Sequence, residues 1–261
     1  MKKSGQSDVW EAVRLYDNMK VALKKFRGDK NEATDCSITE LKALVKLKHP
    51  NVINVLEFYW DPAPCLVMEF IDGPTLSEFF TEKGHLPAAI VTKVLRGIGE
   101  GLEYLHRNQV VHRDLKPANI ILEGTELKPV LIDLGLAKST YEGSTPHLHG
   151  THRWMAPEML DLKDDKFHFS DKSDVYAMGI IMWQTFTGKI PYPEIKMGPD
   201  ELIKIGDFIK EVKAGTRPSL SGVTAAPHLI ELMKKCWDGL PSRRPSMGEF
   251  LLGLSPGGND L

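Results

Sequence analysis

The hydrophobic pattern of the chain changes its period near Gly73, and this change limits the fold more than any other feature. Apolar and polar residues alternate over 8–15 and 19–26, on either side of a Tyr-Asp-Asn turn, which is the pattern of a β-hairpin. The apolar runs 52–60 and 65–70 predict two more strands. Beyond Gly73 the apolar residues recur at helical spacing. A strand-rich front and a helix-rich back indicate an α+β protein in two lobes, with the seam near Gly73.

Helical periodicity also marks individual segments on both sides of this seam. In the front, 37–47 is expected to form one helix, which the following His-Pro-Asn-Val sequence would end. In the back, 75–84 and 88–108 are expected to be helices, and 119–133 reads as the one hairpin among them. The strongly apolar segment 175–186 predicts a buried helix.

Composition excludes several classes of function. The chain has 33 basic and 35 acidic side chains, so its net charge of −2 gives no general attraction to nucleic acid or to an anionic membrane. Its cysteines, Cys36, Cys65 and Cys236, are odd in number and far apart, which disfavours a disulfide framework and favours a reducing compartment. No apolar targeting segment follows the N-terminal lysines, and 175–186 is too short to cross a bilayer. We therefore expect a cytoplasmic protein.

A polar cluster lies between two short apolar runs at 110–122. The Val-Val before it and the Ile-Ile-Leu after it predict short buried strands, so the cluster is expected to be a loop on a rigid support. Charged and amide side chains mounted in this way suggest a chemical role. The polar residues of the cluster are His112, Arg113, Asp114, Lys116 and Asn119.

A second polar site follows the next predicted strand. The hairpin brings Asp133 close to Asn119, and a carboxylate beside an amide oxygen is a ligand pair suited to Mg²⁺. Asp114 could accept a proton or orient a hydroxyl group. Lys24 offers a positive charge from the front lobe, and Glu40 could pair with it.

Some of these residues also have purely structural interpretations. Glu40 completes the capping-box pattern that starts at Ser37, Asp133 could be a turn residue, and Asp174 could be a helix N-cap. We favour the ion pair for Glu40 because Lys24 precedes it. Three histidines are interpreted as loop residues rather than metal ligands: His147, His149 and His152.

Taken together, these motifs resemble the signature set of a eukaryotic-type protein kinase. The resemblance covers about 9–252 and implies a small N-lobe with an antiparallel sheet and one helix (1–72), a larger, mainly helical C-lobe (73–255) and a tail (256–261). Each tripeptide alone is weak, whereas the whole set in the family's order is specific. The matching motifs are Val-Ala-Leu-Lys24, Glu40, His112-Arg113-Asp114 through Asn119, Asp133-Leu134-Gly135 and Ala156-Pro157-Glu158.

The resemblance assigns roles around ATP and Mg²⁺, with Mn²⁺ as an alternative. Lys24 would hold the α and β phosphates and pair with Glu40, and Asp114 would be the catalytic base. Asn119 and Asp133 would bind the metal. These positions match the family's motif residue by residue.

The same resemblance assigns the adenine site and a contact to the transferred phosphate. Met68 would be the gatekeeper, and Glu69 and Ile71 would give hydrogen bonds to adenine through backbone atoms. Lys116, two residues after Asp114, would touch the transferred phosphate, as in kinases of serine and threonine. The adenine ring would lie between three apolar side chains: Val9, Ala22 and Ile121.

Two further segments narrow the branch of the family. Residues 150–159 and 236–247 resemble the tyrosine-kinase-like group, especially receptor-interacting and mixed-lineage kinases, most of which modify serine or threonine. Dual specificity stays open. The resemblance also implies a buried ion pair between Arg244 and Glu158, and it implies that Asp174 holds the loop that contains the catalytic residues.

The chain departs from the family in its glycine-rich loop. Lys2, Ser4 and Ser7 stand where the family has glycines, and only the displaced Gly5 remains. Side chains there should hinder the approach of backbone amides to phosphate, so nucleotide binding is expected to be weaker. Met1 falls inside the expected first strand, as in a trimmed fragment or a chain without that strand. The alternative is a pseudokinase, a scaffold with little or no ATP turnover.

The leading hypothesis is transfer of phosphate from ATP to serine or threonine of protein substrates in intracellular signalling. The intact motif residues favour it over the scaffold, and Ala156-Pro157-Glu158 disfavours a small-molecule kinase. Because Arg113 precedes Asp114, we expect control by phosphate added by an upstream kinase or by autophosphorylation. The candidate acceptors are Ser139, Thr140, Tyr141, Ser144 and Thr145.

Overall fold

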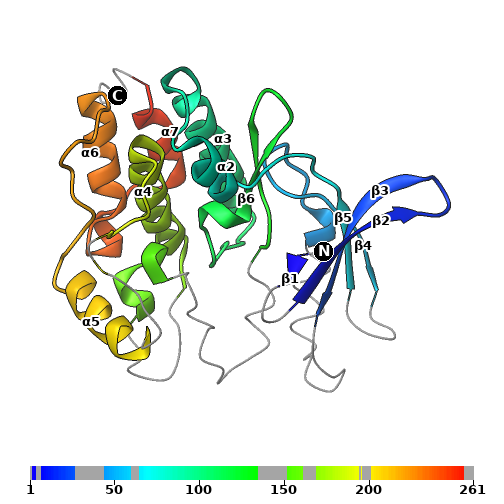
Figure 1. Cartoon of the computed structure of the whole chain (residues 1–261), viewed down its shortest axis with the longest axis horizontal. Coiled ribbons are helices and arrows are strands. Elements are labelled where there is room, and N and C mark those ends of the chain that lie inside the picture. Colours follow the sequence, from blue (N-terminus) through cyan, green and yellow to red (C-terminus); the bar gives the residue numbers. More distant parts are fainter. Residues whose placement is uncertain are drawn as a thin grey trace.

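The computed structural model has a β-sheet at one end and a mainly helical body at the other (Figure 1). It describes residues 2–3, 7–26, 44–59, 65–134, 152–160, 169–193, 195 and 201–255. Of the helix expected over 37–47, only the end is described, and 44–46 is helical there. The rest of that prediction lies outside the described residues.

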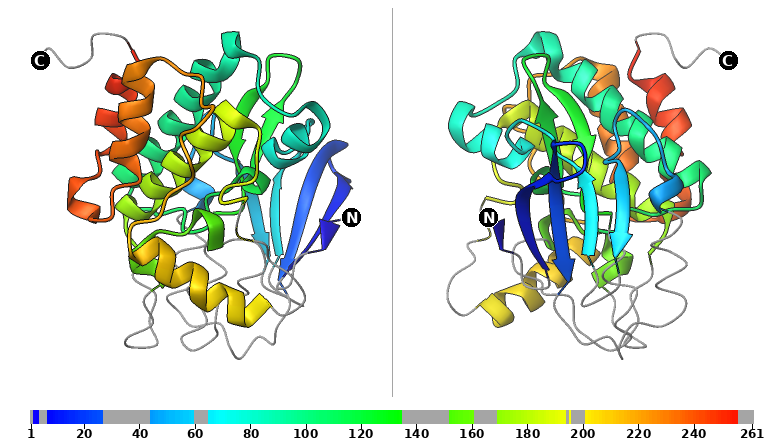
Figure 2. Two further views of the ribbon diagram at one scale, coloured as in Figure 1. Left: turned by 60° about the vertical axis from the view of Figure 1, so that its left-hand side comes forward. Right: turned by 90° about the vertical axis from the view of Figure 1, so that its right-hand side faces the viewer.

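The sheet is antiparallel, with five strands in the order β1-β2-β3-β5-β4, and its strands lie side by side in front of the helical body (Figure 2, right). The predicted hairpin is present, and Asn18 in its turn has a left-handed backbone, with φ 57°. Asparagine tolerates this conformation better than most residues. The strands are β1 Lys2–Lys3, β2 Ser7–Arg14, β3 Met19–Phe26, β4 Val55–Tyr59 and β5 Cys65–Glu69.

Strand β4 begins three residues later than the apolar run 52–60 predicts. Val52 donates its backbone N–H to the carbonyl of His49, and Ile53 donates to the carbonyl of Leu131 in the helical body, 2.8 Å away. These backbone groups are therefore used in a turn and in a contact between the two parts of the molecule. The prediction was wrong here because apolar composition does not reveal which partner the backbone will bond.

The helical body is built around α4, which is buried on nearly all sides, as its apolar sequence predicts. Helix α4 lies between α3 and α6 in Figure 1 and packs against both. Its last turn ends at Gly188, whose φ of 66° suits glycine. The helices are α2 Leu76–Lys83, α3 Ala88–Arg107, α4 Asp171–Thr187, α5 Glu201–Lys213, α6 Pro227–Cys236 and α7 Met247–Gly253.

A two-stranded hairpin, β6 Ile120–Glu123 with β7 Lys128–Leu131, joins this body to the sheet. Its position between α3 and the sheet is visible in Figure 1. Besides the bond from Ile53, the N–H of Leu131 donates to the carbonyl of Asn51 at 2.8 Å. The hairpin thus holds the end of β7, which precedes Asp133, at the boundary between the two parts.

Val110 and Val111, which the sequence predicts to be a strand, are not in one. Val110 donates its N–H to the carbonyl of Leu105 at 2.9 Å and so closes the end of α3. The prediction was wrong because this backbone bonds to a helix end instead of a neighbouring strand. Among the described residues, no helix combines the length and apolar character needed to cross a membrane.

Candidate active site

The polar loop, residues 110–119, is fixed by Asp174 in the first turn of α4. The buried carboxylate accepts the backbone N–H of His112 at 2.8 Å and that of Arg113 at 3.0 Å, and Nε2 of His106 lies 2.9 Å from Oδ2. Arg113 has φ 68°, a conformation that a non-glycine residue rarely adopts. A strained backbone of this kind persists only where other contacts stabilise it, and the two hydrogen bonds to Asp174 do so here.

Within the polar loop, three side chains converge. Nζ of Lys116 donates to Oδ2 of Asp114 at 3.0 Å. The amide nitrogen of Asn119 donates to the backbone carbonyl of Asp114 at 2.7 Å and to Oδ2 at 3.1 Å. These bonds orient the carboxylate of Asp114. Because they use the amide nitrogen of Asn119, its amide oxygen is the atom that could ligate a cation.

Asp133 joins this cluster from the end of β7. Ile132 donates its backbone N–H to the carbonyl of Asn119 at 2.9 Å, which places the next residue beside the amide. Asp133 has φ 58° and accepts a hydrogen bond from Nζ of Lys24 on β3. Lys24 is only 7% exposed. A cation of the sheet and a carboxylate of the helical body therefore meet at the boundary of the two parts.

The contact with Lys24 favours the ionised form of the Asp133 carboxyl group. Burial by itself would raise the pKa of its carboxyl group, but the charge and hydrogen bond of Lys24 outweigh burial, with additional contributions from His112 and Lys116. The pKa of Asp133 is lowered as a result. Its side chain remains 40% exposed, so an ionised carboxylate is accessible next to Asn119.

These two oxygen ligands fit a hard divalent cation. Carboxylate and amide oxygens are the donors that Mg²⁺ prefers, and Mg²⁺ keeps water or phosphate oxygens in its other positions. Among the described residues, no group of three or more His, Cys, Asp and Glu could hold a metal without such additional ligands. Asn119 and Asp133 would leave the other positions of such an ion to water or phosphate oxygens.

Three of the residues expected around a base, Val9, Ala22 and Met68, lie on neighbouring strands of the sheet. Ala22 and Lys24 lie two residues apart on β3 and so share one face of the sheet, and Val9 is paired with Lys24 on the neighbouring strand. Met68 is paired with Ala22 on the other side. Ile121 lies on β6, in the helical body.

The connector, residues 69–74, links β5 to α2 and is anchored at several points. Asn54 accepts the backbone N–H of Glu69 at 3.0 Å and donates its own N–H to Oε1 of Glu69 at 2.8 Å. Ile71 is buried in the core. A Cβ atom on Gly73 would lie 2.0 Å from the carbonyl oxygen of Leu122, so only glycine allows this close approach.

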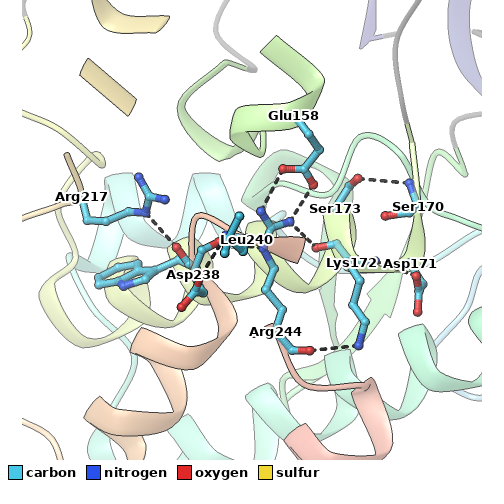
Figure 3. A network of polar contacts seen from close by, with 10 residues as sticks. Glu158, Ser170, Asp171, Lys172, Ser173, Arg217, Asp238, Leu240 and Arg244 are labelled. Atoms are coloured by element: carbon cyan, nitrogen blue, oxygen red, sulfur yellow. Dashed lines mark hydrogen bonds and ion pairs between the residues drawn. The ribbon is translucent and has the colours of Figure 1, made fainter. Parts of the chain in front are cut away.

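A buried ion pair between Arg244 and Glu158 braces the helical body (Figure 3). The guanidinium of Arg244 donates to both carboxylate oxygens of Glu158, at 2.7 and 2.8 Å. It also donates to the backbone carbonyls of Lys172 at 2.9 Å and Asp238 at 2.8 Å. The pair therefore ties the segment around Glu158 to the start of α4 and to the chain beyond α6.

Sequence reasoning missed several residues that support this arrangement. The ring of Tyr176 on α4 contacts two guanidinium groups, with Arg217 at 5.1 Å and Arg244 at 5.0 Å from its centre. His106 contacts Asp174, and Lys172 donates to the carbonyl of Arg244 at 3.0 Å. No motif or period marks these residues, because each contact joins positions far apart in the chain.

Some of the other predicted site residues lie in the described part of the chain and others lie outside it. The guanidinium of Arg113 lies over the ring of Phe169, 5.5 Å from its centre, and His152 packs edge-to-face against Phe208. Lys2 and Ser7 lie in β1 and β2. The following predicted residues lie outside the described ones: Ser4, Gly5, Ser37, Glu40, Ser139, Thr140, Tyr141, Ser144, Thr145, His147 and His149.

Comparison with known proteins gives one consistent family. The family described as "Protein kinase domain" matches residues 4–252. The chain is 30% identical over 241 residues to "Serine/threonine-protein kinase STY17" of Arabidopsis thaliana, covering 90% of this chain and 40% of that protein.

Two further relatives come from other lineages. The chain is 35% identical over 240 residues to "Mitogen-activated protein kinase kinase kinase 7" of Homo sapiens, covering 88% of this chain and 37% of the relative. It is 30% identical over 242 residues to "Dual specificity protein kinase pyk3" of Dictyostelium discoideum, covering 92% of this chain and 17% of that protein. The chain thus spans less than half the length of these curated relatives.

Proposed function

This chain belongs to the protein kinase family, as a domain of the tyrosine-kinase-like type, and on that premise we propose that it transfers the γ-phosphate of ATP to serine or threonine of protein substrates. The observation that supports this most directly is the contact between Lys24 and Asp133, since it joins a sheet cation to the acidic cluster of the helical body. One relative is named a dual-specificity kinase, so tyrosine is a second candidate acceptor.

For nucleotide binding, the proposal uses groups from both parts of the molecule. The adenine ring would lie against Val9 and Ala22 on the sheet and Ile121 on β6, with Met68 behind it. The backbone atoms of Glu69 and Ile71 in the connector would form hydrogen bonds with the edge of the adenine ring. Lys24 would hold the α and β phosphates, and Glu40 remains its proposed partner.

The metal in this proposal is Mg²⁺, held by Asn119 and Asp133. When bound, it would neutralise charge on the phosphate groups. The lowered pKa of Asp133 supports this role, because the carboxylate stays ionised at neutral pH. The amide of Asn119 is oriented by its two bonds to Asp114, which favours presentation of its oxygen.

The proposed chemistry depends on positioning and charge. Asp114 would orient the substrate hydroxyl and accept its proton as the oxygen attacks the γ-phosphorus. The bond from that phosphorus to the β–γ bridging oxygen breaks in the same step, and ADP leaves. Lys116, whose Nζ lies 3.0 Å from Oδ2 of Asp114, would touch the transferred phosphate. Its positive charge would stabilise the negative charge that moves with the phosphoryl group.

Regulation and location are part of the same proposal. Phosphate on the segment after Asp133, added by an upstream kinase or by the chain itself, would pair with Arg113 and support the polar loop. The five candidate acceptors named above lie on that segment. We place the activity in cytoplasmic signalling, on the basis of the cysteine pattern and the kinase relatives.

A transfer assay tests the proposal. The purified chain is incubated with Mg²⁺, γ-labelled ATP and a generic protein substrate, beside Asp114→Asn and Asp133→Asn. Asp207→Asn, at an exposed position on α5, is the matched control. We expect label on serine and threonine with the wild type and Asp207→Asn, and background label with the other two. Wild-type transfer at the Asp114→Asn level would instead favour a scaffold.

A further inference from the structure

Lys20 lies in one row with Ala22 and Lys24 on β3. Lys20, Ala22 and Lys24 are spaced two apart, so they lie on one face of the sheet, and Lys24 contacts Asp133 from that face. The pairing of Val21 with Glu69 brings Lys20 to the level of the residue that follows β5. Lys20 thus lies at the outer end of the row, beyond the place proposed for the base.

At this end, Lys20 contacts the connector. Its Nζ lies 3.8 Å from the ring centre of Phe70 and 2.9 Å from Oε1 of Glu11 on β2. A cation over an aromatic face is attracted by the ring quadrupole. The side chains of Lys20 and Glu11 are 50% and 59% exposed, so water weakens the ion pair between them.

The other connector residues are held by backbone contacts or by the core. Glu69 is bonded to Asn54, as described above. Further along, the carbonyls of Asp72 and Pro74 accept N–H groups of the β6 hairpin at 3.1 and 2.9 Å. Phe70 lies between these anchors, directly between the two residues whose backbone atoms are proposed to bond adenine. Its contact with Lys20 ties this part of the connector to the sheet.

We propose that Lys20 is a positioning residue for the nucleotide base: by holding Phe70, it fixes the backbone of Glu69 and Ile71 in the geometry that bonds adenine. The inference rests on the proposed function, because it concerns the nucleotide of that same site. Lys20 touches neither the phosphates nor the reacting atoms, so its loss acts on base affinity and leaves the transfer step intact.

The size of the effect is limited by the strength of the contact. The connector can be bound to Lys20 through Phe70 or released from it. The free-energy difference between these two states cannot change by more than the free energy of the half-exposed cation–π contact itself. The dissociation constant of the base should therefore rise by about two- to fivefold when the contact is removed.

Equilibrium binding of adenosine and of Mg²⁺-ATP to the purified chain tests this. Lys20→Gln and Phe70→Leu should each weaken both ligands by the same factor, and the double variant should be no weaker than the weaker single. Lys20→Arg keeps the cation and should bind as the wild type does. Glu11→Gln removes only the ion pair and should also bind normally, like Lys93→Gln, a matched variant of an exposed, paired lysine on α3.

Adenosine separates positioning from simple charge attraction, because it carries no phosphate. If Lys20→Gln weakens ATP but binds adenosine like the wild type, Lys20 acts by long-range charge and the inference is overturned. Normal binding of adenosine by Phe70→Leu also overturns it. In turnover, Lys20→Gln should raise KM for ATP without lowering kcat, and a fall in kcat alone would count against it. A wild type that binds neither ligand contradicts the proposed function itself.

Discussion

Replacing Arg244 with methionine should be among the most destabilising single changes in the helical body. Its side chain is fully buried and donates four hydrogen bonds, two to Glu158 and two to backbone carbonyls. Removing one partner of a buried ion pair costs about 3–5 kcal/mol. Because Glu158 is 22% exposed and partly solvated, we expect the lower end, about 3 kcal/mol.

Arg244→Lys separates charge from geometry. Lysine keeps the positive charge but cannot bond both carboxylate oxygens and both carbonyls from one planar group. Losing at least two hydrogen bonds at about 1 kcal/mol each predicts a loss of about 2 kcal/mol. Lysine should therefore fall between the wild type and methionine in stability.

Urea unfolding followed by circular dichroism at neutral pH measures these differences. Lys234→Met is the matched control, because Lys234 pairs with Glu231 at 2.7 Å on the exposed face of α6. That variant should lose less than about 1 kcal/mol. If Arg244→Met costs no more than Lys234→Met, the buried pair does not brace the helical body and the reasoning is refuted.

Three further changes probe other parts of the structure. Gly73→Ala should cost about 1–3 kcal/mol in thermal unfolding, because its Cβ would strike the β6 backbone, whereas Gly206→Ala in α5 meets open space and should not destabilise. Asp174→Asn should lower kcat about 10- to 100-fold in the transfer assay by loosening the polar loop, and an unchanged kcat would count against that hold. The pKa of the Glu57 carboxyl group is lowered, and the hydrogen bond from Tyr59 is the largest cause. Glu57 therefore stabilises the folded chain at pH values above its unfolded pKa, and this stabilisation is lost as the pH falls through its folded pKa. Tyr59→Phe should raise that pKa in a carboxyl NMR titration, and no change would rule out the bond.

The sequence was most informative where chemistry depends on residues close together in the chain. Period-two alternation predicted the hairpin of β2 and β3, and helical period predicted α2 and α3 nearly to their ends. The predicted polar residues Asp114, Lys116 and Asn119 do meet in one cluster, because only a few residues separate them.

Long-range contacts were not predictable in the same way. Lys20 lies fifty positions before Phe70, and nothing in the local pattern indicates that they meet. The same holds for the contacts of Tyr176 with Arg217 and Arg244, since they depend on how three distant segments pack. The β-branched side chain of Val110 favours a strand, but its backbone N–H bonds to the end of α3.

The proposal that a sheet cation and the oxygen ligands of the helical body act on one nucleotide is tested most directly by ATP binding with and without Mg²⁺. Lys24→Gln should weaken binding in both conditions, because its ammonium is proposed to hold the phosphates. Asp133→Asn should bind metal-free ATP at least as well as the wild type, since it removes a negative charge, and should lose the gain in affinity that Mg²⁺ gives. If Asp133→Asn keeps the wild-type dependence on Mg²⁺, the account is contradicted.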